Sequence, residues 1–226
     1  MSYQNKNVVL VGAGYWGTNI AKNLIKLDVK NLIIYDVNTK NARLLNKRLG
    51  LRGKVKNDLT ELIKDKKNEH FIFATPPSKN LSLIVKTLKH NKKIFIEKPG
   101  FKNLSEINYL IKKYPKKIKN LTFGYIYVFN NYIKFIKIFI ENKKNGKILY
   151  VKFQRQNLGP IRNDVDVSYD LSAHDLSIFL YFFGKNLKLI NQNSYKILNK
   201  KISDISNLNF KIKNFYADIN NSWINP

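Results

Sequence analysis

The sequence contains no cysteine and only five arginines among its 226 residues. The absence of cysteine excludes a disulfide framework and any metal site built from thiolates. Long apolar runs are also lacking, because no stretch approaches the length needed to cross a bilayer and the first residues contain no apolar segment long enough for a secretory signal. We therefore expect a soluble cytoplasmic protein that has no membrane partner.

Lysine dominates the charge of the chain. The formal net charge is +26, and 36 lysines occur together with 31 asparagines. A basic protein attracts nucleic acid in general, but these lysines are spread through every segment, and arginine, which forks onto phosphates and reads base edges, is scarce. This bias toward lysine and asparagine is typical of a genome-wide nucleotide composition that determines which residues fill replaceable surface positions. We expect nonspecific binding at low salt and no dedicated nucleic-acid function.

Apolar runs alternate with helical patterns along the first half of the chain. Runs typical of buried strands cover Asn7–Gly12, Leu32–Tyr35, His70–Thr75, Lys93–Glu97 and Leu121–Tyr127. Helical spacing separates them at residues 15–27, 41–49, 58–64, 79–90 and 104–114. Strands that alternate with helices imply βαβ crossovers. The sequence therefore predicts an α/β fold whose first domain, residues 1–124, is a doubly wound parallel sheet of the Rossmann type.

The pattern changes near Tyr125, where helices and strands begin to occur in runs. The spacing predicts helices over 131–142 and 169–183, strands over 148–156, 187–198 and 208–219, and an irregular loop over 157–167. Grouped elements of this kind are typical of an α+β domain. We place this second domain at residues 125–226.

A GxGxxG motif stands where the first predicted strand meets the first predicted helix. It comprises Gly12, Gly14 and Gly17, with Tyr15 and Trp16 between the last two glycines. In a dinucleotide-binding turn, the first glycine permits the tight turn, the second lets the backbone approach a pyrophosphate, and the third allows close packing of helix on strand. The phosphates then lie at the helix N-terminus.

Asp36 follows the second predicted strand, 19 residues after Gly17. A carboxylate there accepts hydrogen bonds from the ribose hydroxyls and repels a 2′-phosphate. No arginine stands beside it, so the motif favours NAD over NADP. The alternative is a glycine turn followed by a surface aspartate, which the βαβ context disfavours.

Two further motifs follow predicted strands and so fall at the carboxyl edge of the sheet, where ligands bind in doubly wound folds. They are Thr75-Pro76-Pro77 and Glu97-Lys98-Pro99. Their place makes Thr75, Pro76, Pro77 and Glu97 candidate cofactor contacts and puts Lys98 near the nicotinamide end. From spacing alone, however, Lys98 is simply one of 36 lysines.

The ordered set of motifs resembles the Gfo/Idh/MocA oxidoreductases. In that family a GxGxxG turn, a T-P-P-like loop, an E-K-P motif and a D-x-x-x-H pair recur in this order, and here the pair is Asp170 and His174. The resemblance covers the chain from beginning to end. It implies an NAD-dependent enzyme that transfers hydride between a secondary alcohol and nicotinamide, with Lys98, Asp170 and His174 as the catalytic residues and an open, largely antiparallel second sheet.

The chemistry of these residues agrees with that assignment. Asp170 and His174 are four residues apart, so on a helix they share a face and the carboxylate can orient the imidazole. A histidine near neutrality accepts a proton as hydride leaves, and Lys98 either holds the same oxygen or serves as the acid and base itself. The sequence leaves both roles open. Without the resemblance, His174 on an apolar helix would be taken as a structural histidine.

The segment from Arg155 to Asp170 resembles the substrate loop of family members associated with sugar-nucleotide metabolism. We expect Arg155, Asn157 and Arg162 to contact substrate hydroxyls or a diphosphate, and Tyr125 at the domain junction to be a substrate contact. A solvated loop and a packing aromatic are the alternatives. The expected substrate is a sugar or sugar nucleotide, with a free polyol such as an inositol as the second choice.

The second sheet is expected to be incomplete. In the family, a strand resembling Asn221-Ser222-Trp223-Ile224 is followed by further strands, whereas this sequence ends at residue 226. The family pairs through that sheet, so the homo-oligomer that the resemblance implies is in doubt. A fragment, a truncated product and a compact variant are the alternatives. A catalytically silent NAD-binding or regulatory protein is the rival function.

Overall fold

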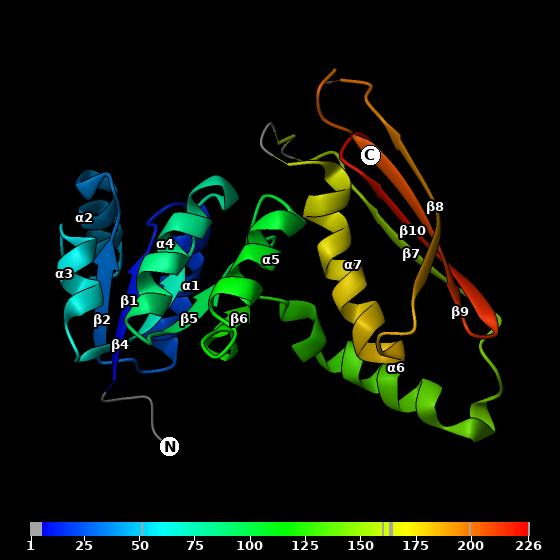
Figure 1. Cartoon of the computed structure of the whole chain (residues 1–226), viewed down its shortest axis with the longest axis horizontal. Coiled ribbons are helices and arrows are strands. Elements are labelled where there is room, and N and C mark those ends of the chain that lie inside the picture. The colour runs from blue at the N-terminus through cyan, green and yellow to red at the C-terminus, as the bar shows by residue number, and fades with distance from the viewer. Residues whose placement is uncertain (1–5, 51, 160, 163–164, 199, 226) are drawn as a thin grey trace. The chain divides into compact units, whose positions relative to one another are not determined.

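A computed structural model of the protein describes residues 6–50, 52–159, 161–162, 165–198 and 200–225 (Figure 1). The chain divides into two compact units between Gly124 and Tyr125. The predicted loop over 157–167 includes residues 160, 163 and 164, which lie outside the described part, as do residues 1–5 and 226. Within the described ranges, no helix is long and apolar enough to cross a membrane.

The first unit is built on a parallel sheet of six strands. These are β1 (Asn7–Val11), β2 (Asn31–Tyr35), β3 (Lys54–Val55), β4 (Asn68–Phe73), β5 (Lys93–Ile96) and β6 (Leu121–Phe123). Their order in the sheet is β3-β2-β1-β4-β5-β6. The chain runs outward from β1 in one direction and then, from β4, in the other, which confirms the doubly wound topology and creates a switch point between β1 and β4.

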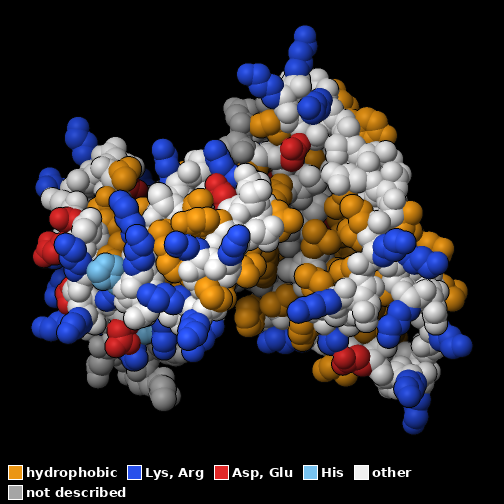
Figure 2. Space-filling view, viewed as in Figure 1, with side chains coloured by type: hydrophobic (Ala, Val, Ile, Leu, Met, Phe, Trp, Pro, Cys, Tyr) orange, Lys and Arg blue, Asp and Glu red, His pale blue; other side chains and the backbone are white. Residues whose placement is uncertain are grey.

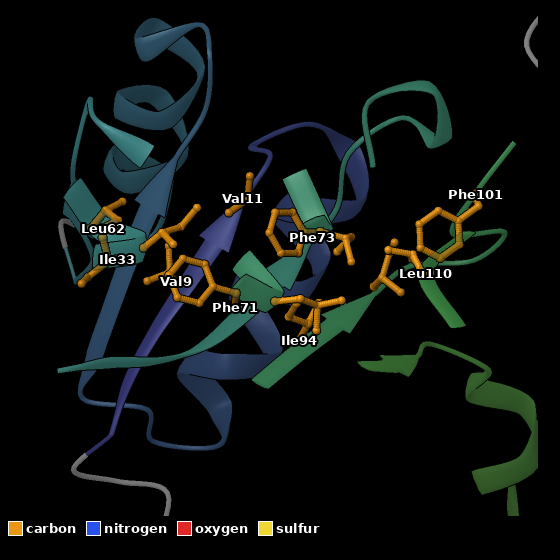
Figure 3. Close-up of a cluster of buried hydrophobic side chains, with 13 residues drawn as sticks. Val9, Val11, Ile33, Leu62, Phe71, Phe73, Ile94, Phe101 and Leu110 are labelled. Carbon is orange, nitrogen blue, oxygen red and sulfur yellow. The ribbon is translucent and has the colours of Figure 1, made fainter. Parts of the chain in front are cut away.

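Helices cover both faces of this sheet. They are α1 (Tyr15–Lys26), α2 (Thr39–Arg48), α3 (Leu59–Lys64), α4 (Pro77–Lys89) and α5 (Leu104–Lys113), and a short 3-10 helix, η2 (Ile118–Asn120), precedes β6. Val9 and Val11 of β1 pack in a cluster with residues of α3, α4 and α5. Figure 3 draws this cluster and labels Leu62 of α3 and Leu110 of α5. Leu10, between them, belongs to a second cluster with α1 and α2. Each fully buried side chain of this size stabilises the fold by about 1.5–3 kcal/mol.

Two predictions for the first unit were incomplete. The strand expected over Leu121–Tyr127 ends at Phe123, and residues Ile126–Phe129 form a 3-10 helix, η3. The reason is the neighbouring strand: Phe123 pairs with Ile96, the last residue of β5, so the ladder has no partner beyond it. Strand β3 was not predicted, because two residues carry no periodicity.

The second unit places one long helix on a four-stranded sheet. After η3 come α6 (Asn131–Glu141), η4 (Lys143–Asn145), β7 (Tyr150–Gln156), α7 (Val167–Phe183), β8 (Lys188–Tyr195), β9 (Ile205–Ile212) and β10 (Phe215–Ser222). The sheet order is β7-β10-β9-β8, and only the β7–β10 pair is parallel. Phe179 of α7 is fully buried among apolar residues of β9 and β10. The expected α+β architecture with a largely antiparallel sheet is confirmed.

The strand expected over Leu208–Ile219 is a hairpin. β9 and β10 pair in antiparallel fashion, and Ile212 lies opposite Phe215, so the loop contains two residues. Lys213, the first of them, has a φ of 37°. Turns of this length need positive φ and usually contain glycine. The turn residues, Lys213 and Asn214, do not include a glycine, and for that reason the turn was not predicted.

Basic side chains are distributed over the surface. Figure 2 shows Lys and Arg side chains scattered among apolar and neutral ones over the visible face of each unit, and no single stripe gathers them. This distribution agrees with the interpretation that the lysines occupy replaceable surface positions.

Candidate functional site

At the glycine turn after β1, the backbone approaches both the residue that follows β4 and the first turn of helix α1 closely. Gly12 has a φ of +102°, and a Cβ atom there would lie 2.5 Å from the carbonyl oxygen of Ala74. A Cβ atom at Gly17 would lie 2.0 Å from the carbonyl oxygen of Gly12. Both positions therefore require glycine, one for the turn and one for the seating of α1 on it. At Gly14, by contrast, a Cβ atom would meet nothing within 4 Å.

The N-terminus of α1 is free of the caps that most other helices carry. Its N-cap is Gly14, no side chain caps it, and its first turn holds no acidic residue. Side chains of Asn38, Asp58, Asn103 and Asn130 accept hydrogen bonds at the N-termini of α2, α3, α5 and α6. The first-turn N–H groups of α1, beside the open space at Gly14, are therefore suited to hold a phosphate.

Two large aromatic side chains flank this helix N-terminus. Tyr15 is 79% exposed and Trp16 is 50% exposed. Their ring centroids are 5.7 Å apart in an edge-on arrangement. Exposed aromatic surface of this size beside an open helix end is suited to pack against a flat ligand.

Asp36 is joined directly to the glycine turn. One carboxylate oxygen accepts a hydrogen bond from the Ala13 N–H at 2.7 Å, and the other accepts one from the Asn38 N–H at 2.8 Å. The Gly12 N–H also donates to the Tyr35 carbonyl at 2.8 Å. An ionised carboxylate has about four acceptor positions, so these two bonds fix its orientation and leave others for ligand hydroxyls.

The loops after β4 and β5 are held together by Asn80 on α4. The Thr75 hydroxyl donates to the Asn80 side-chain oxygen, and the Asn80 amide donates to the Gly100 carbonyl at 2.6 Å. Pro76 is the N-cap of α4 and Pro77 is its first residue. Asn80 is buried, and the sequence reasoning missed it. Its place one turn after the Thr-Pro-Pro motif was the available signal.

Glu97 and Lys98 directly follow β5. The Glu97 N–H donates to the Phe73 carbonyl at 3.1 Å, which keeps the loop on the sheet edge. Burial raises the pKa of Glu97, although a backbone hydrogen bond from Lys98 and the charge of Lys98 act in the opposite direction. The Lys98-Pro99 peptide bond is cis, a point that the sequence could not decide.

A recess of about 890 Å³ in the first unit lies away from these loops. Val8, His70, Phe71, Lys93 and Ile94 are among the residues that line it. His70 and Lys93 stand at or near the beginnings of their strands. None of the predicted cofactor residues lines this recess.

Helix α7 of the second unit carries both Asp170 and His174. Asp170 is buried, and its Oδ1 lies 3.4 Å from Nη1 of Arg162, which precedes the helix. His174 lies one turn further along, and its ring centroid is 4.8 Å from that of Tyr127 in an edge-on contact. The two residues share a helix face as predicted, and Arg162 is paired with the carboxylate of this site.

Arg155 on β7 is bound to Asp175 on α7. Its Nη2 and Nε donate to Asp175 Oδ1 at 2.7 and 3.1 Å, and Nε also lies 3.3 Å from Oδ2. Burial alone lowers the pKa of Arg155, but the hydrogen bonds and charge of Asp175, with a smaller contribution from Tyr127, raise it overall. Asn157 is exposed, its N–H donates to the Ser222 carbonyl, and Tyr125 is half-buried just before η3.

Three residues of the second unit were missed by sequence reasoning. They are Tyr127, Asp175 and Asn221. Asp175 directly follows His174, and burial of an acidic residue in an apolar helix demands a partner. That demand was the one signal available in the sequence, and it does not identify the partner.

Comparison with known proteins agrees with the fold. The family model described as "Oxidoreductase family, NAD-binding Rossmann fold" matches residues 6–125. The chain therefore belongs to the Gfo/Idh/MocA oxidoreductase family, and its first unit is an NAD-binding Rossmann domain.

Individual relatives extend the match into the second unit. Myo-inositol 2-dehydrogenase of Thermotoga maritima is 25% identical over 201 residues, which are 85% of this chain and 59% of the relative. The scyllo-inositol 2-dehydrogenase (NAD(+)) of Bacillus subtilis is 28% identical over 206 residues, 88% of this chain and 59% of the relative. This chain thus spans a little under 60% of the length of these two relatives.

A solved structure shows the same fold. GenD2 from gentamicin A biosynthesis, in complex with NAD, superposes with a TM-score of 0.88 at 15% identity. The alignment covers 100% of this chain and 68% of that one. At this identity the likeness establishes the fold alone.

Proposed function

We propose that the protein is an NAD-dependent dehydrogenase that oxidises a secondary alcohol on a sugar, a sugar nucleotide or a cyclic polyol. The observation that carries this proposal is the geometry around Gly14, where the space is open and the N-terminus of α1 has no side-chain cap. The Asp36 carboxylate is fixed beside the same turn. These three features together suit a dinucleotide with two phosphates and a ribose.

The cofactor residues take distinct roles in this proposal. Gly12 and Gly17 shape the turn, Gly14 leaves the approach open, and the first-turn N–H groups of Tyr15 and Trp16 face the phosphates. Asp36 accepts hydrogen bonds from the ribose hydroxyls. Bound NAD supplies the hydride acceptor. The loops that contain Thr75, Pro76, Pro77 and Glu97 border the cofactor at the carboxyl edge of the sheet.

Proton transfer is assigned to Lys98, Asp170 and His174. His174 accepts the proton of the substrate hydroxyl, and the buried carboxylate of Asp170, four residues earlier on α7, favours the protonated imidazole. Lys98, in the first unit, is assigned the binding of a substrate oxygen by charge and hydrogen bond. In this assignment, the ion pair between Asp170 and Arg162 keeps both charges in fixed positions at this face of α7.

The substrate is assigned to the class of polyhydroxylated rings. The names of the two inositol dehydrogenase relatives support this class. Tyr125, Asn157 and Arg162 are the proposed substrate contacts, and an arginine suits a phosphorylated or nucleotide-linked substrate. Pairing of two chains through the second sheet is part of the same proposal.

The test is ligand-induced stabilisation of the 226-residue chain, because a ligand that binds only the folded state raises the melting temperature. NAD, NADH and NADP are added singly, and NAD is then combined with inositols, free sugars and UDP-sugars. We expect a shift with NAD and NADH and a further shift with one ring alcohol. Absorbance of NADH then reports turnover, which should be lost in Lys98→Ala and His174→Gln.

The alternative is a catalytically silent protein that keeps the NAD-binding turn described above. It predicts stabilisation by NAD without turnover of any alcohol. No shift with any dinucleotide would overturn both functions.

A further inference from the structure

We infer that Tyr127, Arg155 and Asp175 form a positioning group that sets the orientation of the His174 imidazole. This inference rests on the proposed function of His174, and it gives Arg155 a role other than the substrate contact suggested by its loop. The three residues come from η3, β7 and α7 of the second unit. They form a chain of contacts that ends at the histidine ring.

The first link is the ion pair between Arg155 and Asp175. The side chain of Asp175 is 3% exposed and that of Arg155 is 23% exposed. The guanidinium approaches both carboxylate oxygens, at distances of 2.7, 3.1 and 3.3 Å. Asp175 Oδ2 also accepts a hydrogen bond from the Asn221 amide of β10 at 3.0 Å. A fork with several short contacts in a buried setting allows the guanidinium little freedom.

A second buried contact holds this part of α7 on the sheet. The Ser172 hydroxyl donates to the side-chain oxygen of Asn221, whose amide binds Asp175. Ser172 and Asn221 are both buried. The turn of α7 that carries His174 is thus bound to the sheet at Ser172 on one side and at Asp175 on the other. The backbone of His174 is thereby fixed.

The second link is Tyr127, which lies between Arg155 and His174. The guanidinium carbon of Arg155 is 4.7 Å from the centroid of the Tyr127 ring, and Nη1 donates to the Tyr127 hydroxyl at 3.2 Å. The ring centroid of Tyr127 is 4.8 Å from that of His174, with an interplanar angle of 71°. Arg155 thus holds the tyrosine by both its ring and its hydroxyl, and the tyrosine ring packs against the imidazole.

This arrangement occupies most of the donors of Arg155. The guanidinium has five N–H groups, and each of its three nitrogens donates within the second unit, to Asp175 or to Tyr127. A substrate contact through these occupied N–H groups would have to displace a charge-assisted hydrogen bond. Geometric control of a catalytic group is important, because a misplacement of about 1 Å can reduce a rate by about 100-fold.

The decisive variant is Arg155→Lys, which keeps the charge but loses the fork and the planar contact with Tyr127. The ring signals of His174 are recorded by NMR on histidine-labelled full chain and assigned by their loss in His174→Gln. The protein has three histidines, and the other two, His70 and His90, belong to the first unit and serve as internal references. We expect the His174 signals to move and broaden while the reference signals stay in place.

Two more variants separate the links. Tyr127→Phe keeps the ring against His174 and loses only the hydroxyl, so it should retain most of the wild-type His174 signal, whereas Tyr127→Leu should lose it. Lys152→Arg exchanges one cation for another at an exposed position of β7 and is the matched control for Arg155→Lys. We expect no change in that control.

Kinetics supply the second readout. With a working substrate, Arg155→Lys should lower kcat by at least about tenfold, in keeping with a misplaced catalytic group, and leave the KM for NAD unchanged. A raised KM for the alcohol with unaltered His174 signals would show that Arg155 is a substrate contact and overturn the inference. Unaltered signals in both Arg155→Lys and Tyr127→Leu would do the same. Lack of turnover by the wild-type chain would instead count against the proposed function, and the NMR result would still decide the positioning role.

Discussion

The Asp36 carboxylate accepts a hydrogen bond from the Ala13 N–H at 2.7 Å, and this contact joins the end of β2 to the glycine turn after β1. The two residues are 23 positions apart in the chain. The bond fixes the acidic side chain beside the open space at Gly14 before any ligand arrives. A preorganised acceptor of this kind avoids an ordering cost when a ligand binds.

Gly14 and Gly17 should respond differently to alanine. A Cβ atom at Gly17 would overlap the Gly12 carbonyl at 2.0 Å, so Gly17→Ala should destabilise the first unit by roughly 1–3 kcal/mol. Gly14→Ala meets no neighbour within 4 Å, and its φ of −76° suits alanine. It should unfold near the wild-type temperature and lose the stabilisation by NAD, because its methyl group occupies the path of the phosphates.

Thermal unfolding with and without NAD measures both effects. A Gly14→Ala protein that is still stabilised by NAD to the wild-type extent would contradict the assigned path of the cofactor.

Replacement of Asp36 by asparagine should shift the cofactor preference toward NADP. The substitution keeps the shape and one acceptor oxygen but removes the charge that repels a 2′-phosphate. It also weakens hydrogen bonds to the ribose, and a charged hydrogen bond contributes about 1.5–3 kcal/mol. The ratio of the Kd values for NADP and NAD should therefore fall by about tenfold or more.

Calorimetric titration with each dinucleotide gives these constants. Asp28→Asn is the matched control, because it removes an equal charge from a loop residue that pairs with Lys30 in the same unit. Equal ratios for wild-type and Asp36→Asn proteins would rule out the assigned contact between Asp36 and the ribose.

Glu97 should make the stability of the chain depend on pH. Burial raises the pKa of Glu97 above its ordinary value of 4.5, so the folded state favours the neutral carboxyl more than the unfolded state does. Its contribution to stability is present below 4.5 and is lost as the pH rises through the raised pKa of the folded state. Glu97→Gln, which stays neutral, should therefore melt at a higher temperature than wild-type at neutral pH and at a similar temperature in acid.

Melting curves from pH 4 to 8 for wild-type, Glu97→Gln and the exposed control Glu61→Gln test this expectation. A constant difference between wild-type and Glu97→Gln across this range would show that the carboxyl does not titrate differently in the two states.

Most of the first unit could be predicted because its signals are local. Buried parallel strands appear as short apolar runs, and Gly12 is required by a positive φ within a single turn. The end of β6 could not be predicted in the same way, since it depends on where β5 stops and leaves Phe123 as the last paired residue. Asn80, which joins two strand-end loops through Thr75 and Gly100, likewise has a role that only the packed sheet reveals.

By itself, the sequence determined the doubly wound first unit, the place of the glycine turn, Asp36 at the end of β2, and the shared helix face of Asp170 and His174. Only the tertiary structure decided that Arg155 binds Asp175, that Tyr127 lies between Arg155 and His174, and that Asn221 completes the group. These contacts join residues 20, 28 and 46 positions apart. They depend on the register of β7 against β10 and on the seating of α7 over the sheet, and no periodicity within one segment encodes either.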